Sequence, residues 1–325
     1  MIRLQNKQDF NYGNIKIFSG SSHPGLAQEV AEYLGVALSR RELVKFPNDN
    51  IFVRLEESVR GKDVYVINTA CAPVNDNIME TLIFCDAIRR GSAARITVVM
   101  PYMPYGRSDK KDQPRVPITA RLMADIIQTA GADRYITVDL HAGQIQGFFT
   151  IPGDEVSSFH ILCDYLLEKK LFNATIVTND LGFAKKGRNY AATLDMPLAF
   201  MEKRRTSNDT KSEILSIIGD VEGRDVIIVD DEISTGGSLM NTLKAVQDHG
   251  ARDIYVVCTH GIFVGPALER LKSLPVKEFV TTNTVPQLVA KSVLHNLTVL
   301  SIGPLLGEVM ARVHDGRSVG AMWNE

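Results

Sequence analysis

Short runs of β-branched and other apolar residues recur along the chain, and they alternate with longer segments in which apolar positions repeat every three or four residues. The short runs predict strands and the longer segments predict helices. This alternation is typical of mostly parallel sheets with helices on both faces, which bind ligands at the carboxyl ends of their strands. We expect strands at residues 15–18, 64–68, 96–100, 135–139, 175–178, 226–230, 254–259, 278–282 and 297–302, and helices at 26–34, 79–88, 120–129, 161–167 and 239–246.

Two stretches of the chain resemble each other. Residues 130–141 (AGADRYITVDLH) and 249–260 (HGARDIYVVCTH) each combine a helix end, a glycine, a strand and a histidine at the exit of the strand. Two similar α/β halves would produce this echo, although two ordinary helix-to-strand units could share it by chance. We expect one domain over 1–148 and a second over 149–302, with a C-terminal helix in 303–325 that returns to the first.

Composition narrows the class of protein. A chain of 325 residues is long enough for two domains. The formal net charge of −2 argues against a general nucleic-acid surface. The four cysteines are widely separated and have no metal-ligand spacing, and no apolar run is long enough to span a bilayer. We therefore expect a reduced, soluble, cytoplasmic protein without a nucleic-acid or membrane partner.

The strongest chemical signal is the segment VIIVDDEISTGGSL at residues 226–239, where an apolar strand runs into two carboxylates and then a glycine turn before a helix. Backbone N–H groups of such a turn, together with the helix N-terminus, suit a phosphate group, and ionised aspartates accept hydrogen bonds from sugar hydroxyls. A phosphorylated ribose fits both features, whereas the simpler alternative is a tight turn capped by Asp and Ser. The candidate sugar ligands are Asp230, Asp231, Ser234, Thr235, Gly236, Gly237 and Ser238.

The chain has neither a GxxxxGK[ST] P-loop nor a GxGxxG fingerprint. It resembles instead the ribose-phosphate diphosphokinases, also called phosphoribosyl pyrophosphate synthetases, and the match runs nearly end to end. The resemblance implies two tandem type I phosphoribosyltransferase-like domains. It also implies an Mg²⁺-dependent enzyme that transfers a diphosphoryl group from ATP to ribose 5-phosphate and releases AMP. The matching segments are FSGSSHP (18–24), ESVRG (57–61), PVNDN (73–77), RSDKKD (107–112) and DLHAGQIQGFF (139–149).

The resemblance also assigns roles to residues. It implies Mg²⁺ near His141 and Asp180, a diphosphate loop at 180–183, and two catalytic cations, Lys203 and Arg205, in a polar loop over 201–209. On sequence alone that loop could equally be a solvated turn, Asp180 a helix cap and His141 a capped strand end. The diphosphate loop comprises Asp180, Leu181, Gly182 and Phe183, and the implied ATP ligands are Phe46, Asn48, Asn50, Arg107, Ser108, Asp112 and His141.

Several positions depart from the family pattern. Asn50 and Ser108 replace the usual Glu and Gln on the adenine side, and Ser234 replaces an Asp in the sugar loop. Phe183 replaces a glycine and could crowd the approach of a ligand to the backbone. Phe46 could instead be a core residue, and Arg107 could pair with a nearby aspartate. The resemblance further implies a homo-oligomer, a hexamer of dimers, with a regulatory site at Ser58, Arg60, Arg115 and Ser318.

Two other functions remain open. A phosphoribosyltransferase that consumes the activated sugar would explain the loop at 230–238 but not the duplicated N-terminal half. A regulatory homologue without catalytic activity would explain the departures but not the retention of Lys203, Arg205 and His141.

Overall fold

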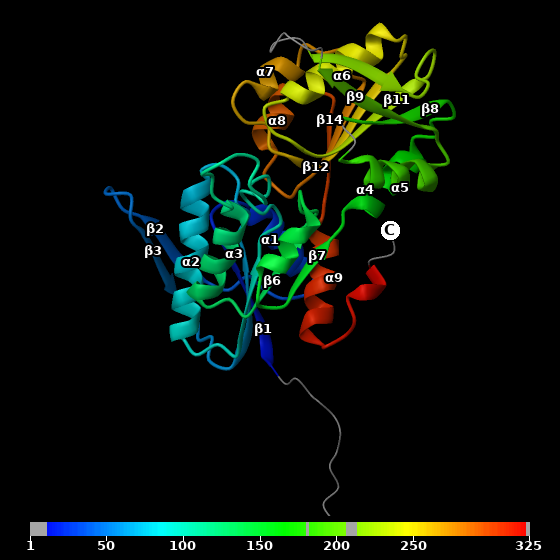
Figure 1. Cartoon of the computed structure of the whole chain (residues 1–325). Helices are drawn as coiled ribbons and strands as arrows, with labels where there is room; N and C mark the ends of the chain where they lie inside the picture. The colour runs from blue at the N-terminus through cyan, green and yellow to red at the C-terminus, as the bar shows by residue number, and fades with distance from the viewer. Residues whose placement is uncertain (1–11, 180–181, 206–212, 323–325) are drawn as a thin grey trace, which may run out of the picture. The chain divides into compact units, whose positions relative to one another are not determined.

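The computed structural model describes residues 12–179, 182–205 and 213–322 (Figure 1). The chain forms two compact units, one made of Met1–Val156 with Gly303–Asn324 and the other of Ser157–Ile302. The division falls after Val156 rather than after residue 148, because β7 (Gly153–Val156) continues the first sheet. Each unit has the α/β architecture that the sequence pattern predicted.

The first unit contains a five-stranded sheet in the order β1-β4-β5-β6-β7, and every neighbouring pair is parallel. Because successive side chains of a strand point to opposite faces, Val66 and Tyr65 serve different sides of the sheet. Val66 shares a core with Phe84 of α2 and Ile127 of α3, whereas the Tyr65 hydroxyl reaches α9. The strands are β1 (Gly13–Ser19), β4 (Lys62–Ile67), β5 (Arg95–Val99) and β6 (Arg134–Val138); the helices are α1 (Pro24–Tyr33), α2 (Val74–Arg90), α3 (Thr119–Ala130) and α9 (Gly303–His314), with a short 3₁₀ turn at Gly143–Phe148.

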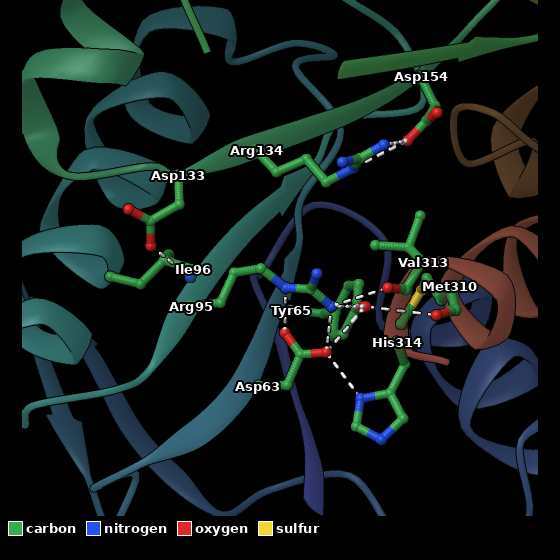
Figure 2. A network of polar contacts seen from close by, with 10 residues as sticks. All are labelled: Asp63, Tyr65, Arg95, Ile96, Asp133, Arg134, Asp154, Met310, Val313 and His314. Carbon is green, nitrogen blue, oxygen red and sulfur yellow. Dashed lines mark hydrogen bonds and ion pairs between the residues drawn. The ribbon is translucent and has the colours of Figure 1, made fainter. Parts of the chain in front are cut away.

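A buried polar network fastens α9 to this sheet (Figure 2). Asp63 is fully buried, and Arg95 donates to its two carboxylate oxygens at 2.8 and 2.6 Å. His314 Nδ1 lies 2.8 Å from the same carboxylate, and the Tyr65 hydroxyl bonds to the Met310 carbonyl oxygen at 3.3 Å. A buried carboxylate is stable only with such partners. The network therefore ties the C-terminal helix to the start of β4 and β5.

A two-stranded antiparallel hairpin, β2 (Arg41–Lys45) and β3 (Ile51–Leu55), projects from the first unit (Figure 1). Two aromatic rings lie on it, those of Phe46 and Phe52, with centroids 6.0 Å apart. They are 45% and 40% exposed. Phe46 is therefore not a core residue of this unit.

The second unit contains a seven-stranded sheet in the order β10-β9-β8-β11-β12-β13-β14, in which only the β10–β9 pair is antiparallel among the described strands. Val226 and Ile228 pack into a core on one face, and Ile227 and Val229 pack into a core on the other. The strands are β8 (Ala174–Thr178), β9 (Leu198–Arg205), β10 (Glu213–Ile218), β11 (Asp225–Ile233), β12 (Ile254–Gly261), β13 (Glu278–Thr282) and β14 (Leu297–Leu300); the helices are α4 (Phe159–Glu168), α5 (Ala184–Leu194), α6 (Gly237–Asp248), α7 (Ala267–Leu271) and α8 (Leu288–Val293).

The two echoing stretches have the same local structure up to their histidines. Gly131 after α3 and Gly250 after α6 both have positive φ, at 114° and 80°, and a parallel strand follows each. The histidines differ, because His141 follows β6 as an exposed residue whereas His260 lies inside β12 and is buried. The expectation of a histidine at both strand exits is therefore wrong for His260, whose Nδ1 lies 2.9 Å from the Thr284 hydroxyl.

Candidate active site

The acidic segment after residue 229 remains in the sheet longer than expected. Strand β11 continues through Asp230 and Asp231 to Ile233, and its outer residues pair with β12. Gly236 has φ 75°, a conformation that favours glycine, and α6 begins at the next residue. Among the described residues, no side-chain hydrogen bond caps the N-terminus of α6, so its first-turn N–H groups suit an anion. Thr235 and Ser238 beside this turn are exposed.

Asp230 lies at the centre of this arrangement. Its Oδ2 accepts a hydrogen bond from the Asn179 side-chain amide at 2.5 Å, and its Oδ1 accepts one from the Asp231 backbone N–H at 3.0 Å. Burial, reinforced by the like charge of Asp231, raises the pKa of Asp230 to about 8. Such a perturbation at a strand end is typical of a functional carboxylate.

The diphosphate loop implied by the sequence lies between β8 and α5. Asp180 and Leu181 are outside the described residues. Gly182 is exposed, and Phe183 occupies the N-cap position of α5 with its ring packed against the core of the second unit. Lys186 Nζ lies 5.6 Å from the centroid of that ring. The aromatic side chain is thus accommodated by the core, which weakens the expectation that it crowds the loop.

The predicted polar loop at residues 201–209 is wrong over its first part. Residues 201–205 form the end of β9, where Lys203 pairs with Leu215 and Arg205 with Glu213 of β10. The side chains of Lys203 and Arg205 and the residues from 206 to 209 lie outside the described part of the chain. Their catalytic role stays a prediction.

The implied ATP ligands of the first unit lie in two places. Phe46, Asn48 and Asn50 form the exposed turn of the β2–β3 hairpin, which is closed by a hydrogen bond from Phe46 N to Asn50 O at 2.8 Å. The Asn48 side-chain oxygen accepts from Asn50 N at 3.3 Å. The Phe46 ring is therefore exposed to solvent, whereas the Asn48 side-chain oxygen already accepts a hydrogen bond within the turn.

The second place is the loop that precedes α3. Gly106 packs against His141, since a Cβ added to the glycine would lie 3.4 Å from the histidine Cβ, so Arg107 and His141 belong to one region. Both side chains are exposed, as is Asp112. Ser108 accepts a hydrogen bond from Thr119 N at 3.2 Å and thus supports the start of α3. Its departure from the family pattern therefore has a local structural role.

The four expected regulatory residues are exposed and lie in three segments of the first unit: Ser58 and Arg60 before β4, Arg115 before α3, and Ser318 after α9. The Ser318 hydroxyl accepts from Gly320 N at 3.2 Å. Arg115 has φ 67°, in the left-handed region.

A cavity of about 640 Å³ opens in the first unit at the amino ends of the strands, the end opposite to the expected chemistry. Arg95, Arg134 and Arg317 line it together with Tyr12 and Asp154. Figure 2 shows Arg134 bonded to Asp154 beside this cavity. None of the predicted catalytic or substrate ligands lines it.

Sequence reasoning missed Asn179, which the structure places against Asp230. Its position at the end of a predicted strand, directly before the candidate ligand Asp180, could have identified it as a site residue. Within the residues described, none of the helices combines the length and the hydrophobicity that a membrane crossing requires.

Comparison with known proteins agrees with these features. The model of the N-terminal domain of ribose phosphate pyrophosphokinase matches residues 15–131, and that of the phosphoribosyl synthetase-associated domain matches residues 205–324. The chain is 46% identical to the ribose-phosphate pyrophosphokinase of Caldanaerobacter subterraneus subsp. tengcongensis, over 95% of this chain and 98% of that protein. It is 45% identical to that of Clostridium acetobutylicum, over 97% and 99%.

A solved structure is also similar. Phosphoribosylpyrophosphate synthetase from Mycobacterium smegmatis aligns with a TM-score of 0.89 and 41% identity, covering 94% of this chain and 100% of that one. The two family models and these near full-length relatives show that the chain belongs to the ribose-phosphate pyrophosphokinase family.

Proposed function

We propose that this chain transfers the β,γ-diphosphoryl group of ATP to the C1 hydroxyl of ribose 5-phosphate, giving 5-phosphoribosyl 1-diphosphate and AMP for nucleotide biosynthesis. The observation that carries the proposal is the end of β11, where two adjacent carboxylates precede a glycine turn and an uncapped helix N-terminus. The names and extent of the relatives support the same reaction.

The sugar-binding half of the reaction follows from this geometry. The 5-phosphate suits the N–H groups at the start of α6, where Gly237 is partly exposed and has no Cβ. An added Cβ at Gly237 would meet its nearest atom, the Thr235 hydroxyl, only at 3.9 Å. Asp230 and Asp231 accept hydrogen bonds from the ribose hydroxyls. This arrangement orients the sugar and leaves its C1 hydroxyl for attack on the β-phosphorus.

Magnesium fits the chemistry of the donors. Mg²⁺ prefers oxygen ligands and usually keeps several waters, binding through few protein groups and the phosphates of a substrate. Within the described residues no three His, Cys, Asp or Glu side chains gather around one point, and His141 is an exposed imidazole suited to a metal-bound water. His141 and Asp180 would interact with the ion mainly through bound water and the substrate phosphates. The ion would neutralise negative charge on the polyphosphate.

The proposed nucleotide ligands lie in the first unit, and the two proposed catalytic cations lie in β9 of the second. The exposed Phe46 ring is suited to stacking on adenine, and Arg107 beside His141 is suited to the phosphates. Lys203 and Arg205 would stabilise the negative charge that develops on the transferred group.

The remaining expectations belong to the same proposal. The exposed hairpin turn, with Phe46 at 45% exposure, suits a contact with a second copy of the chain, in keeping with a homo-oligomer, a hexamer of dimers. A cytoplasmic location and a regulatory site at Ser58, Arg60, Arg115 and Ser318 complete the proposed properties.

The decisive assay mixes the protein, ribose 5-phosphate and Mg-ATP and measures AMP and 5-phosphoribosyl 1-diphosphate, which should form one-for-one. Absence of AMP at every phosphate concentration would favour a regulatory homologue without activity. Release of diphosphate from added 5-phosphoribosyl 1-diphosphate and a base, without AMP formation, would favour a phosphoribosyltransferase.

A further inference from the structure

Asn179 and Asp230 meet because of the register of two parallel strands. Thr178, the last residue of β8, pairs with Val229 of β11, so Asn179 follows the end of β8 beside Asp230, where β11 continues in the sheet. Asn179 is 8% exposed, and its Nδ2 donates to Asp230 Oδ2 at 2.5 Å. No described residue bonds to the Asn179 Oδ1, which is buried. The described hydrogen bond of the Asn179 side chain is therefore directed at Asp230.

We propose that Asn179 is a positioning residue of the sugar site: its amide holds the Asp230 carboxylate, in the ionised form, to accept hydrogen bonds from two adjacent ribose hydroxyls. The inference rests on the proposed function and assigns a role in it to a residue outside the sugar loop.

Hydrogen-bond capacity supports this role. A carboxylate has about four acceptor sites on its two oxygens. The Asn179 amide occupies one on Oδ2, and the Asp231 backbone N–H occupies one on Oδ1. The Asp231 side chain also bonds to Asp230 when the pair holds a proton. When both carboxylates are ionised neither can donate, so one acceptor direction remains on each Asp230 oxygen, which matches two neighbouring hydroxyls of a sugar. A protonated Asp230 would lose this pattern, because one oxygen would become a donor.

The surroundings of Asp230 oppose its ionisation, so the ionised carboxylate needs a hydrogen-bond donor to stabilise it. Burial and the neighbouring Asp231 raise the pKa of Asp230 to about 8, whereas the hydrogen bonds from Asn179 and the Asp231 N–H lower it. On the opposite strand, Cys258 pairs with Asp230, and burial raises the pKa of its thiol to about 12, so it stays neutral. None of the described groups that shift the pKa of Asp230 is a cation, and the Asn179 amide is the side-chain donor that lowers it.

The identity of the residue matters as well as its place. When Asp230 is protonated, a reversed amide can accept the carboxyl O–H through Oδ1, so asparagine keeps the contact in both protonation states. Leucine has nearly the same volume but offers no donor, and aspartate has the same shape but adds a third carboxylate. Both substitutions therefore remove the amide hydrogen bond while leaving a side chain of similar size in its place.

The test is the pH dependence of ribose 5-phosphate binding to the full chain without nucleotide, measured by titration calorimetry between pH 6.5 and 9.5. The midpoint is the pH at which binding reaches half of its change between the two extremes. A hydrogen bond to a charged group is strong enough that its loss raises this midpoint by about one pH unit. For Asn179→Leu we expect affinity about tenfold weaker at pH 7.5, with recovery to within about threefold at pH 9.5. Asn179→Asp should raise the midpoint further because it adds like charge.

Controls separate positioning from structural damage. Asn173→Leu changes an exposed asparagine just before β8, at the far end of the strand, and should leave the midpoint unchanged. Calorimetry in two buffers of different ionisation enthalpy should show a proton released on binding at pH 7.5, more in Asn179→Leu than in the unmodified protein. In an Asp230→Asn background, Asn179→Leu should leave the pH profile unchanged.

The outcomes are distinct. An unmodified protein that does not bind ribose 5-phosphate at any pH would contradict the proposed function. Binding by the unmodified protein, with the same midpoint in Asn179→Leu and Asn179→Asp, would overturn the positioning role alone. If Asn179→Leu does not fold, Asn179→Asp carries the test, and an unchanged midpoint in it overturns the inference.

Discussion

Asp230 is a residue whose environment favours function over stability. Its raised pKa, about 8, means that the folded protein holds a proton which the unfolded chain releases near pH 4. Stability from this group is therefore fully present below about pH 4, falls as the pH rises toward 8, and is lost above that value. The half-buried Asp230 carboxylate beside the buried Asp231 destabilises the ligand-free protein, and hydrogen bonds from a bound sugar would offset that cost.

The substitution Asp230→Asn should raise the melting temperature of the ligand-free, metal-free protein at pH 8.5 by about 2–4 °C, because it removes the buried like charge. Near pH 4 the variant and the unmodified protein should melt together. Calorimetric scans at the two pH values check this. Asp164→Asn, at an exposed position in the middle of α4, should show no gain. An equal gain at both pH values would show that charge is not the cause.

Lys203 offers a second test at the scale of one side chain. Lys203→Ala should lower turnover about 100-fold because a cation near the transferring group is lost, with an unchanged melting temperature. Steady-state kinetics and a thermal melt measure the two effects. Lys272→Ala, a partly exposed lysine paired with Glu269 on the second unit, is the matched control. Near-normal turnover in Lys203→Ala would remove this residue from the mechanism.

At the scale of elements, α5 packs closely on β8, the strand that precedes the proposed diphosphate loop. Gly187 of α5 faces Thr178, and an added Cβ would lie only 2.3 Å from the Thr178 Cγ2. The glycine therefore lets the helix approach the last residue of β8. The same strand end leads to Asn179, so a shift of α5 would disturb the loop and the contact with Asp230.

Gly187→Ala should destabilise the protein and raise the KM for ribose 5-phosphate, because the clash outweighs the better helix propensity of alanine. Gly25→Ala in α1 is the matched control, since its added Cβ meets only His23, at 3.8 Å. It should be neutral or slightly stabilising. Kinetics and melting curves of both variants decide the point; a stable, fully active Gly187→Ala would show that close packing of α5 is not required.

The same elements show how much the sequence could predict. Runs such as 226–230 were correctly predicted as strands because both faces of a parallel strand are buried and apolar. Strands β2 and β7 were missed because they are short and carry adjacent charged residues, as in RELVK and GDEV, so they show neither an apolar run nor an alternating pattern. The Asn179–Asp230 contact depends on strand register, which no local pattern specifies.

At the scale of the whole molecule, the C-terminal segment completes the first unit rather than the second. Helix α9 is fixed through Asp63, whose fully buried carboxylate is bonded by Arg95 and His314 (Figure 2). Helix α9 also buries the side chains of Leu306, Val309 and Met310 completely. Apolar packing and this polar network therefore hold the helix in the first unit together.

Arg95→Met should destabilise the first unit by about 3–5 kcal/mol, because it leaves Asp63 buried without its main partner. Scanning calorimetry should then show a new transition at lower temperature, with the second unit melting as before. Arg90→Met, which removes an exposed ion pair with Asp86 on the same unit, should leave the scan unchanged. A single unshifted transition in Arg95→Met would contradict this anchoring role.

The central claim is that a diphosphoryl group, taken as a unit from ATP, is delivered to a sugar held at the end of β11. ATP carrying ³²P at the β position, incubated with the protein, Mg²⁺ and ribose 5-phosphate, tests this most directly. We predict that the label is recovered in 5-phosphoribosyl 1-diphosphate and that the AMP formed is unlabelled. Label retained in a nucleotide product, with only the γ-phosphate moved to the sugar, would contradict the account.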